Sequence, residues 1–213
     1  MSSSPSLALV DRLIDESFPT FHGWCTPEKA KRMARLVTEL PLSRTPLCVE
    51  LGVFGGRGCF ALGLAVKHCL DGIGHVDGID PFTAAASLEG TNAKPDQDWW
   101  AKVDYGMILE SARAGVARLG LDGIVRFIVK RSQDVVGVYA EKSIDLLHQD
   151  SNHSEECSCY EVETWVPKMK SGGFWLFDDI NWPTTKLAQA RLVTRHAFKI
   201  IESYETWAIY QAP

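Results

Sequence analysis

The sequence predicts an α/β domain with a doubly wound, mostly parallel seven-stranded sheet. Apolar runs of strand length alternate with helical patterns from residue 47 onward, which is typical of parallel strands joined by crossover helices. A glycine-rich turn directly follows the first of these runs, at the place where ligands bind in such sheets. The last two runs are so close together that they must pair as an antiparallel hairpin.

Length and composition are those of an ordinary globular protein. The chain has 213 residues, and at roughly 150 residues per domain we expect one domain over residues 1–213. Apolar residues make up 46% and charged residues 23%, which excludes a largely disordered chain. The net charge of −5 argues against general nucleic-acid binding, which needs a basic surface.

Targeting signals and cysteine usage predict a cytoplasmic protein without a membrane partner. No apolar stretch approaches the roughly 18 residues of a membrane span, and the N-terminus has no basic region of a secretory signal. Of the six cysteines, three lie in apolar or helical runs, which favours reduced thiols over disulfides. Cys157 and Cys159 have no second pair, so they are weak candidates for a zinc site.

Two helices precede the first strand and form a helical segment over residues 1–44. Residues 6–17 carry apolar side chains at helical spacing. Thr26, Pro27 and Glu28 then supply an N-cap, a proline at the first helical position and an acidic first turn. We expect this second helix to run to about Leu40, before Pro41.

The core over residues 45–213 alternates strands with helices. The predicted strands cover residues 47–51, 74–80, 125–130, 143–150, 172–179, 197–203 and 206–212. The predicted helices cover residues 58–70, 105–119, 155–170 and 184–194, with a shorter helix or turn over 132–140. Residues 81–104 read as an insertion without regular structure. This insertion is a candidate lid, with Gly90 as a flexible point.

The glycine-rich turn predicts a cofactor site. Its pattern is Glu50-x-Gly52-x-x-x-Gly56, and Asp80 ends the next strand, where a carboxylate can accept from a ribose diol. The spacing differs from the G-x-G-x-x-G of dinucleotide sites. A buried acid before the first glycine suits a cofactor with a cationic group, such as an adenosyl sulfonium with an amino-acid tail. The alternative is a structural turn with Asp80 as a helix cap.

Three carboxylates follow two further strands and predict a metal site. Asp150 ends the fourth strand, and Asp178 and Asp179 end the fifth. Carboxylates crowded at one sheet edge repel unless a cation lies among them, and oxygen ligands suit Mg²⁺, with Mn²⁺ or Ca²⁺ as alternatives. Adjacent residues face opposite sides of a regular strand, so both reach one ion only where the strand bends or ends. Otherwise one of the two caps the next helix.

These motifs together resemble the class I S-adenosylmethionine-dependent methyltransferases. VELGVFGGRG is similar to the first motif of that family and HVDGIDPF to the second. QDSNHSEE followed by FWLFDDINW resembles the small metal-dependent O-methyltransferases, especially those that act on sugar hydroxyls of macrolide-type natural products. The resemblance implies a Rossmann-like methyltransferase fold and a metal on Asp150, Asp178 and Asp179. It also implies that copies can assemble into a homo-oligomer, for which the N-terminal helices are a candidate interface.

His153 is the candidate general base. It follows Asp150 by three residues, and an imidazole titrates near neutral pH. The alternative is a histidine that caps or packs on the next helix. Some relatives place an aspartate base two residues after the metal-binding acid, where this chain has Asn152, and an amide cannot take the proton. His148 lies within the strand pattern, and we expect a structural role for it.

Further residues are predicted to surround the cofactor and the acceptor. Ser132 and Gln133 follow the third strand, where they would meet the adenine edge or cap a helix. Trp99, Trp100 and Trp182 are candidates for the acceptor pocket or for ordinary core. His22 and Trp24 are further candidates from the N-terminal segment.

The function predicted from these residues is metal-assisted transfer of a methyl group to a hydroxyl of a sugar, a glycan or a glycosylated natural product. In-line transfer needs no covalent intermediate; it needs the two reactants held in line and a base for the hydroxyl proton. The alternatives are a catechol-like acceptor, a methyltransferase-like domain that binds without catalysis, and an NAD(P)-dependent oxidoreductase. An oxidoreductase should lack the three acids and carry the tighter glycine spacing.

Overall fold

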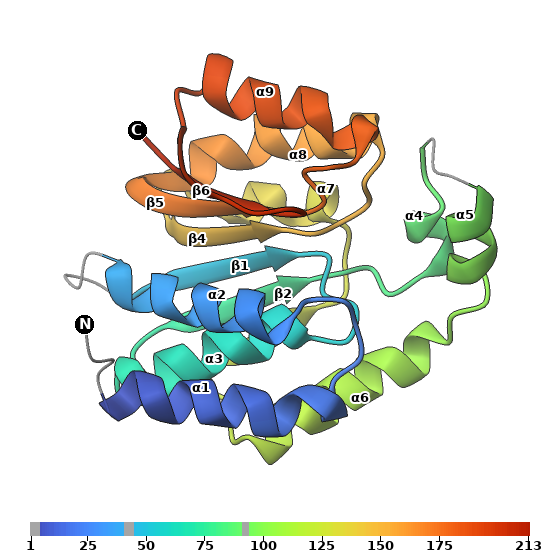
Figure 1. Cartoon of the computed structure of the whole chain (residues 1–213). Coiled ribbons are helices and arrows are strands. Elements are labelled where there is room, and N and C mark those ends of the chain that lie inside the picture. The colour runs from blue at the N-terminus through green and yellow to red at the C-terminus, as the bar shows by residue number, and fades with distance from the viewer. Residues whose placement is uncertain (1–4, 41–44, 91–93) are drawn as a thin grey trace.

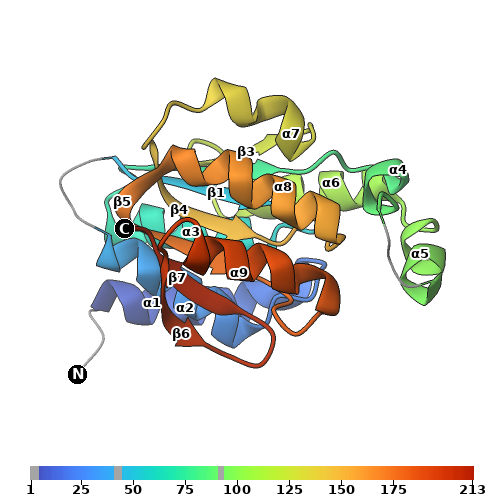
Figure 2. The same ribbon diagram turned by 90° about the horizontal axis from the view of Figure 1, so that it is seen from above.

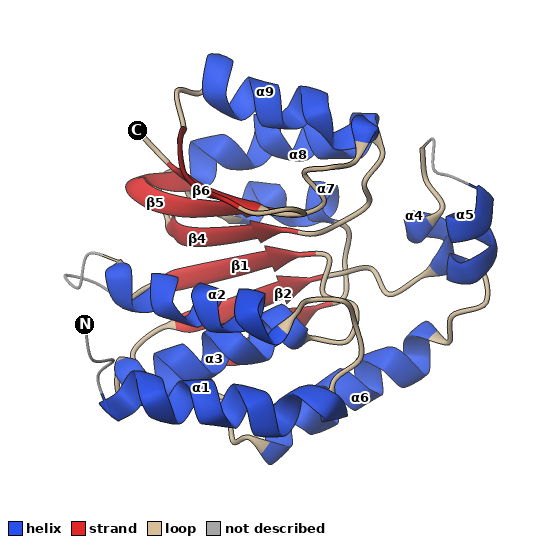
Figure 3. Cartoon of the chain, in the orientation of Figure 1, coloured by secondary structure: helices blue, strands red, loops and turns tan. Residues whose placement is uncertain are grey.

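The computed structural model describes residues 5–40, 45–90 and 94–213 and contains the predicted sheet. Seven strands lie in the order β3-β2-β1-β4-β5-β7-β6. The first five strands are parallel, and β7 pairs antiparallel with both β5 and β6. Helices cover both sides of this sheet (Figures 1 and 3). The strands are β1 (Leu47–Leu51), β2 (His75–Ile79), β3 (Val125–Ile128), β4 (Ile144–Gln149), β5 (Met169–Phe177), β6 (Lys199–Ser203) and β7 (Ala208–Gln211).

The helices form two layers, one on each face of the sheet. On one face lie α1 (Pro5–Ser17), α2 (Pro27–Glu39), α3 (Arg57–Cys69) and α6 (Tyr105–Arg118). On the other lie α7 (Ser132–Val135), α8 (Glu155–Trp165) and α9 (Lys186–Thr194). Short 3₁₀ turns follow α1, α7 and α8 and precede α9: η1 (Phe18–Thr20), η2 (Val136–Val138), η3 (Val166–Lys168) and η4 (Pro183–Thr185).

Strand alternation divides the hydrophobic core in two. Cys48 of β1 and Leu146 of β4 point to the side of α2 and α3, whereas Val49 and Leu147 point to the side of α8 and α9. Successive strand side chains face opposite sides, so each buried strand supplies both layers. The central strands β1 and β4 are therefore buried on both faces, including their polar residues Glu50 and His148.

The predicted second helix of the N-terminal segment is confirmed at its start. Thr26 caps α2, because its hydroxyl accepts from the backbone N–H of Lys29 at 3.2 Å, and Pro27 takes the first position. Pro41, predicted to end this helix, lies outside the described residues. α2 packs on α1 and α3, which places its first turn close to the carboxyl ends of the central strands.

Several boundaries differ from the prediction, and residues 81–104 are not without regular structure. They contain α4 (Ala84–Ser87) and α5 (Lys94–Trp100), which project beyond the strand ends (Figures 1 and 2). Within this candidate lid, positions 91–93 lie outside the described residues. The helix expected over 155–170 ends at Trp165, close before Pro167, which cannot donate to a continuing helix. β4 and β5 end at Gln149 and Phe177, so the acidic residues lie just beyond the sheet.

Candidate active site

The glycine-rich turn and the end of β4 approach each other closely at Gly52. Its φ of +82° lies in the left-handed region, and a Cβ there would lie 2.0 Å from the carbonyl oxygen of Asp150. Only glycine tolerates this conformation and contact. Gly56, also with positive φ, is the N-cap residue of α3. The turn thus leaves β1 directly beside Asp150, as the sequence predicts.

Asp80 holds the glycine-rich turn through backbone hydrogen bonds. Its Oδ2 accepts from the N–H groups of Val53 at 2.9 Å and Phe54 at 3.0 Å, and its Oδ1 accepts from Phe82 N–H at 2.6 Å. Burial raises the pKa of Asp80, and these three donors partly counter that shift. Asp80 lines the cavity beside the turn, and the predicted contact with a ribose stays a prediction.

Glu50 is buried at the end of β1 and has one oxygen without a partner. His148 Nδ1 of β4 and Glu50 Oε1 form a hydrogen bond at 2.8 Å. Glu50 Oε2 makes no hydrogen bond although it is buried. A Cβ on Gly58 would lie 2.0 Å from Oε1, so this glycine makes room for the carboxylate. His148 has the structural role expected of it, and it holds Glu50 with a free oxygen beside the cavity.

A polar network lies beneath the predicted adenine edge. Ser132 donates to Glu161 Oε1 at 2.7 Å, while Ser151 and Gln149 donate to Glu161 Oε2 at 2.6 Å and 3.0 Å. Burial raises the pKa of Glu161, which these donors oppose. Ser132 begins α7 and does not cap it, because the N-cap residue is Arg131. Both Ser132 and Gln133 line the cavity.

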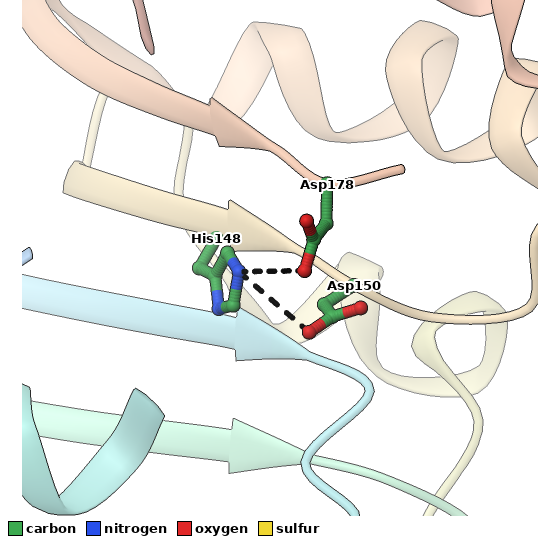
Figure 4. Close-up of side chains that lie close together, drawn as sticks. All are labelled: His148, Asp150 and Asp178. Carbon is green, nitrogen blue, oxygen red and sulfur yellow. Dashed lines mark ion pairs between the residues drawn. The ribbon is translucent and has the colours of Figure 1, made fainter. Parts of the chain in front are cut away.

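The three acidic residues lie together at the ends of β4 and β5, but in two groups that share Asp150. The inner group is His148, Asp150 and Asp178, and the outer group is Asp150, His153 and Asp179. Figure 4 shows the inner group, with His148 Nε2 at 3.8 Å from Asp150 Oδ2 and 3.9 Å from Asp178 Oδ2. In the outer group, His153 Nε2 lies 3.0 Å from Asp179 Oδ2 and 3.6 Å from Asp150 Oδ1.

The backbone separates Asp178 from Asp179. Asp179 has a φ of +47°, and its N–H donates to Asp178 Oδ1 at 3.0 Å. The chain therefore turns at Asp179, which sends the two side chains to different groups. Neither carboxylate caps the helix that follows, since η4 and α9 begin without a side-chain cap.

Lys29 reaches the inner group from α2, a position that the sequence patterns do not predict. Its side chain is 3% exposed; Nζ donates to Asp178 Oδ2 and lies 3.8 Å from Asp150 Oδ2. Burial alone would lower the pKa of Lys29, but the charges of Asp150 and Asp178 outweigh it and raise that pKa. The residue lies more than a hundred positions before its partners, and its only sequence signal is a lysine next to a helix start.

The same charges set the pKa values of the acids. Burial and the neighbouring Asp178 raise the pKa of Asp150 to about 6, against the attraction of Lys29. Burial would also raise the pKa of Asp178, but Lys29 and His148 hold it well below its usual range. For Asp179, burial outweighs the attraction of His153 and raises the pKa.

His153 stays close to two carboxylates in a largely buried place. Burial alone would lower its pKa, yet the contact with Asp150 and the charge of Asp179 raise it. The ring centroid of Trp182 lies 5.0 Å away. His153 lines the cavity with Asp150 and Asp179, so its position suits a base that meets an acceptor there.

Asn152 fastens α4 to the loop that follows β4. Its Nδ2 lies within donor distance of three carbonyl oxygens, those of Ala86, Ser87 and Glu89, at 3.1, 3.3 and 2.9 Å. Its Oδ1 accepts from the N–H of Ser154 at 2.9 Å. A carboxylate could not donate to these carbonyls, which is a physical reason for an amide at this position. Gly90 lies against Ser154, so this part of the candidate lid is packed.

Aromatic side chains line the cavity, which has a volume of about 710 Å³. Trp24 stacks on Phe54 with ring centroids 5.1 Å apart, and both lie within 6.0 Å of Trp99. Trp100 completes this aromatic cluster. All four line the cavity, as do Trp182 and His22, so the structure brings the predicted pocket residues together.

Comparisons with known proteins show the family and the fold. The family model described as a methyltransferase domain matches residues 49–180, which contain the glycine-rich turn and all three acids. The chain belongs to this methyltransferase family. The predicted membership of the class I S-adenosylmethionine-dependent methyltransferases is therefore confirmed. A search of the curated proteins found no match.

Solved structures share the fold of this methyltransferase at low sequence identity. The O-methyltransferase NovP superposes with a TM-score of 0.73 at 16% identity, covering 97% of each chain. TomG from Streptomyces achromogenes, an O-methyltransferase involved in tomaymycin synthesis and solved with SAM, has a TM-score of 0.61 at 15% identity, over 99% of this chain and 91% of TomG. The O-methyltransferase from Bacillus cereus in complex with SAH has a TM-score of 0.61 at 13% identity, over 100% and 93% of the two chains.

Proposed function

We propose that this methyltransferase transfers the methyl group of S-adenosylmethionine to a hydroxyl of a sugar, a glycan or a glycosylated natural product. The observation that carries the proposal is a histidine held between carboxylates in the cavity that the glycine-rich turn also lines. His153 Nε2 lies 3.0 Å from Asp179 and 3.6 Å from Asp150. Such a group suits removal of a proton from an acceptor beside the cofactor.

The cofactor half of the proposal rests on the turn after β1. Glu50 Oε2 is buried, lacks a partner and belongs to a residue that lines the cavity, so it can accept from the ammonium of an amino-acid tail. Gly52 leaves room for the turn, and Asp80 offers its remaining lone pairs to a ribose. Ser132 and Gln133 line the same cavity, and we expect them to meet the adenine edge. TomG and the Bacillus cereus enzyme were solved with SAM and SAH.

The reaction asks little covalent chemistry of the protein. The cofactor, when bound, supplies a methyl group on a sulfonium. His153 takes the proton of the acceptor hydroxyl, whose oxygen forms the new bond to the methyl carbon as the bond from carbon to sulfur breaks. Asp150 and Asp179 favour the imidazolium that results. Holding oxygen and methyl in line contributes up to roughly 7–11 kcal/mol in favourable cases.

The arrangement of Asp150, Asp178 and Asp179 tests whether they can form the predicted metal site. The donors are chemically right for Mg²⁺, but the three carboxylates form two groups and not one. In the inner group, the ammonium of Lys29 lies against Asp178 and Asp150. In the outer group, an ion would need the lone pair of His153. The residues therefore do not fit a site made of all three carboxylates, and the proposed reaction uses no metal. Removal of divalent ions tests the metal assistance predicted from the sequence, and we expect methyl transfer to survive it.

The acceptor class rests on the resemblance and on the aromatic cluster. Indole and phenyl faces pack on the apolar faces of sugar rings and on planar rings alike. Trp24 and Trp99 are 63% and 45% exposed, so both can contact an acceptor at the cavity. A catechol-like acceptor is the second candidate, favoured by the same rings.

Calorimetric titration with S-adenosylhomocysteine, with Mg²⁺ and with EDTA, tests the cofactor first. We expect micromolar binding in both conditions, and methyl transfer to glycosides in a panel that also contains catechols. Transfer to catechols alone would replace the acceptor class. Absence of S-adenosylhomocysteine binding both with Mg²⁺ and with EDTA would overturn the proposal. A nicotinamide cofactor would then be tested.

A further inference from the structure

Lys29 is a buried cation that belongs to the chain itself. Its side chain is 3% exposed, although lysine is almost never buried without a partner. Two carboxylates compensate the charge: Asp178, to which the ammonium donates, and Asp150 at 3.8 Å. Their charges raise the pKa of Lys29 against the effect of burial. The inner group therefore already contains a positive charge.

The ammonium occupies a position that a divalent ion would need. His148 Nε2 and one oxygen each of Asp150 and Asp178 lie within 4.8 Å of one another, and Figure 4 shows them converging. His148 Nε2 is buried without a hydrogen-bond partner. A Mg²⁺ ion on these atoms would lie about 2.0–2.1 Å from each oxygen, and thus directly against the ammonium. Like charges that close, in a place shielded from water, repel strongly.

Contacts at the start of α2 fix the position of Lys29 beside the inner group. Thr26 caps α2 at the backbone N–H of Lys29, which fixes the first turn. Arg57 of α3 donates to the carbonyl oxygens of Phe21 at 3.0 Å and Cys25 at 3.2 Å, and so ties the preceding loop to the glycine-rich turn. These contacts hold the loop before α2 and the first turn of α2, which carries Lys29.

We propose that the Lys29 ammonium is the resident cation of the acidic sheet edge and positions Asp150 and Asp178 in place of a divalent metal ion. The inference rests on the proposed function, because Asp150 and its neighbour His153 are the groups that would face the acceptor. Lys29 is a positioning residue. Its positive charge offsets the repulsion between the carboxylates of Asp150 and Asp178, and it keeps Asp150 oriented toward His153. It follows that methyl transfer proceeds without added divalent ions.

The test compares Mn²⁺ binding by the EDTA-treated, desalted full chain and by variants, followed by calorimetry and by the electron paramagnetic resonance of free Mn²⁺. Lys29→Ala removes the ammonium and leaves the three ligand atoms. We expect Mn²⁺ to bind this variant at least about tenfold more tightly than the wild type, with one ion per chain. The double variant Lys29→Ala/Asp150→Asn should lose the Mn²⁺ affinity that Lys29→Ala gains. That loss would show that the ion binds at the group containing Asp150.

Matched variants separate this role from a purely structural one. Lys31→Ala, on the same helix but paired with Asp15 at the surface, should bind Mn²⁺ like the wild type. Lys29→Met keeps the length of the side chain without its charge and replaces Lys29→Ala if the latter fails to fold. We also expect wild-type methyl transfer to survive EDTA, and transfer by Lys29→Ala to fall at least about tenfold and recover in part with Mn²⁺.

Equal Mn²⁺ binding by wild type and the Lys29 variants, strong or absent in both, would overturn the inference. Loss of wild-type activity in EDTA with recovery in Mg²⁺ would do the same. Failure of the proposed function shows elsewhere, as absent binding of S-adenosylhomocysteine. The Mn²⁺ comparison reports on Lys29 in either case.

Discussion

The inner and outer groups around Asp150 use neighbouring aspartates in opposite ways. Asp178, in the inner group, faces the ammonium of Lys29, and its pKa is held well below the usual range. Asp179, in the outer group, faces His153, and burial raises its pKa. The inner group has a permanent cation and the outer group a titratable one. The two adjacent aspartates thus differ in the direction of their pKa shifts because different side chains pack against them.

The largest expected effect tests whether the outer group carries the chemistry. His153→Ala should lower turnover at least about a hundredfold, because a positioned base contributes roughly 10²–10⁴-fold. Binding of S-adenosylhomocysteine should stay unchanged in calorimetry. His75→Ala is the control, since His75 is exposed at the amino end of β2, away from the site. Unchanged turnover in His153→Ala would remove His153 from the mechanism.

A negative charge introduced at Asn152, beside the outer group, should reduce activity less than His153→Ala does. Asn152→Asp replaces a donor to three carbonyl oxygens by an acceptor, so α4 should loosen. We expect KM for the acceptor to rise about tenfold with a smaller change in kcat. Faster hydrogen exchange of residues 84–89 should accompany it. Asn152→Ala lacks the added charge and should fall between; an Asn152→Asp enzyme with wild-type KM and exchange would contradict the role in the lid.

The pH profile should separate the two groups more finely. His153 must be neutral to accept a proton, and its neighbours raise its pKa. Activity is therefore lost as pH falls through a value above the ordinary histidine pKa of about 6.5. Asp179→Asn removes one of the charges that raise it, so the acid limb of kcat, measured in EDTA, should move to lower pH. Glu163→Gln, which alters the pair with His196 at the surface, should leave the limb in place.

The smallest expected effect concerns stability and belongs to Asp150. Its folded pKa of about 6 exceeds the unfolded value near 3.9, so the folded state binds the extra proton and loses stability as pH rises from about 4 to 6. Asp150→Asn cannot ionise. The Tm of Asp150→Asn relative to the wild type should therefore rise by on the order of 5 °C between pH 4.5 and 7.5. A constant difference across this range in calorimetry would show that Asp150 keeps an ordinary pKa.

Most of the fold could be predicted because it depends on local patterns. The apolar runs predict the strands, Thr26 and Pro27 predict the start of α2, and the spacing of the last two runs predicts their antiparallel pairing. Residues 84–87 and 94–100 were expected to be loop but are helical. The contact of Asn152 with three carbonyl oxygens near α4 helps to hold this segment, and no local sequence pattern predicts that contact.

None of the helices in the described ranges is long and apolar enough to cross a membrane.

For the site, the sequence alone determined which strand ends carry acids. Parallel strands present their carboxyl ends at one edge, so Glu50, Asp80 and Asp150 had to meet near the glycine-rich turn. Only the tertiary structure decided how the charges pair. The positive φ of Asp179 sends it away from Asp178, and the packing of α2 on α3 brings Lys29 to Asp178 and Asp150. Pairing of charges far apart in sequence depends on distances of a few ångströms, which no local pattern encodes.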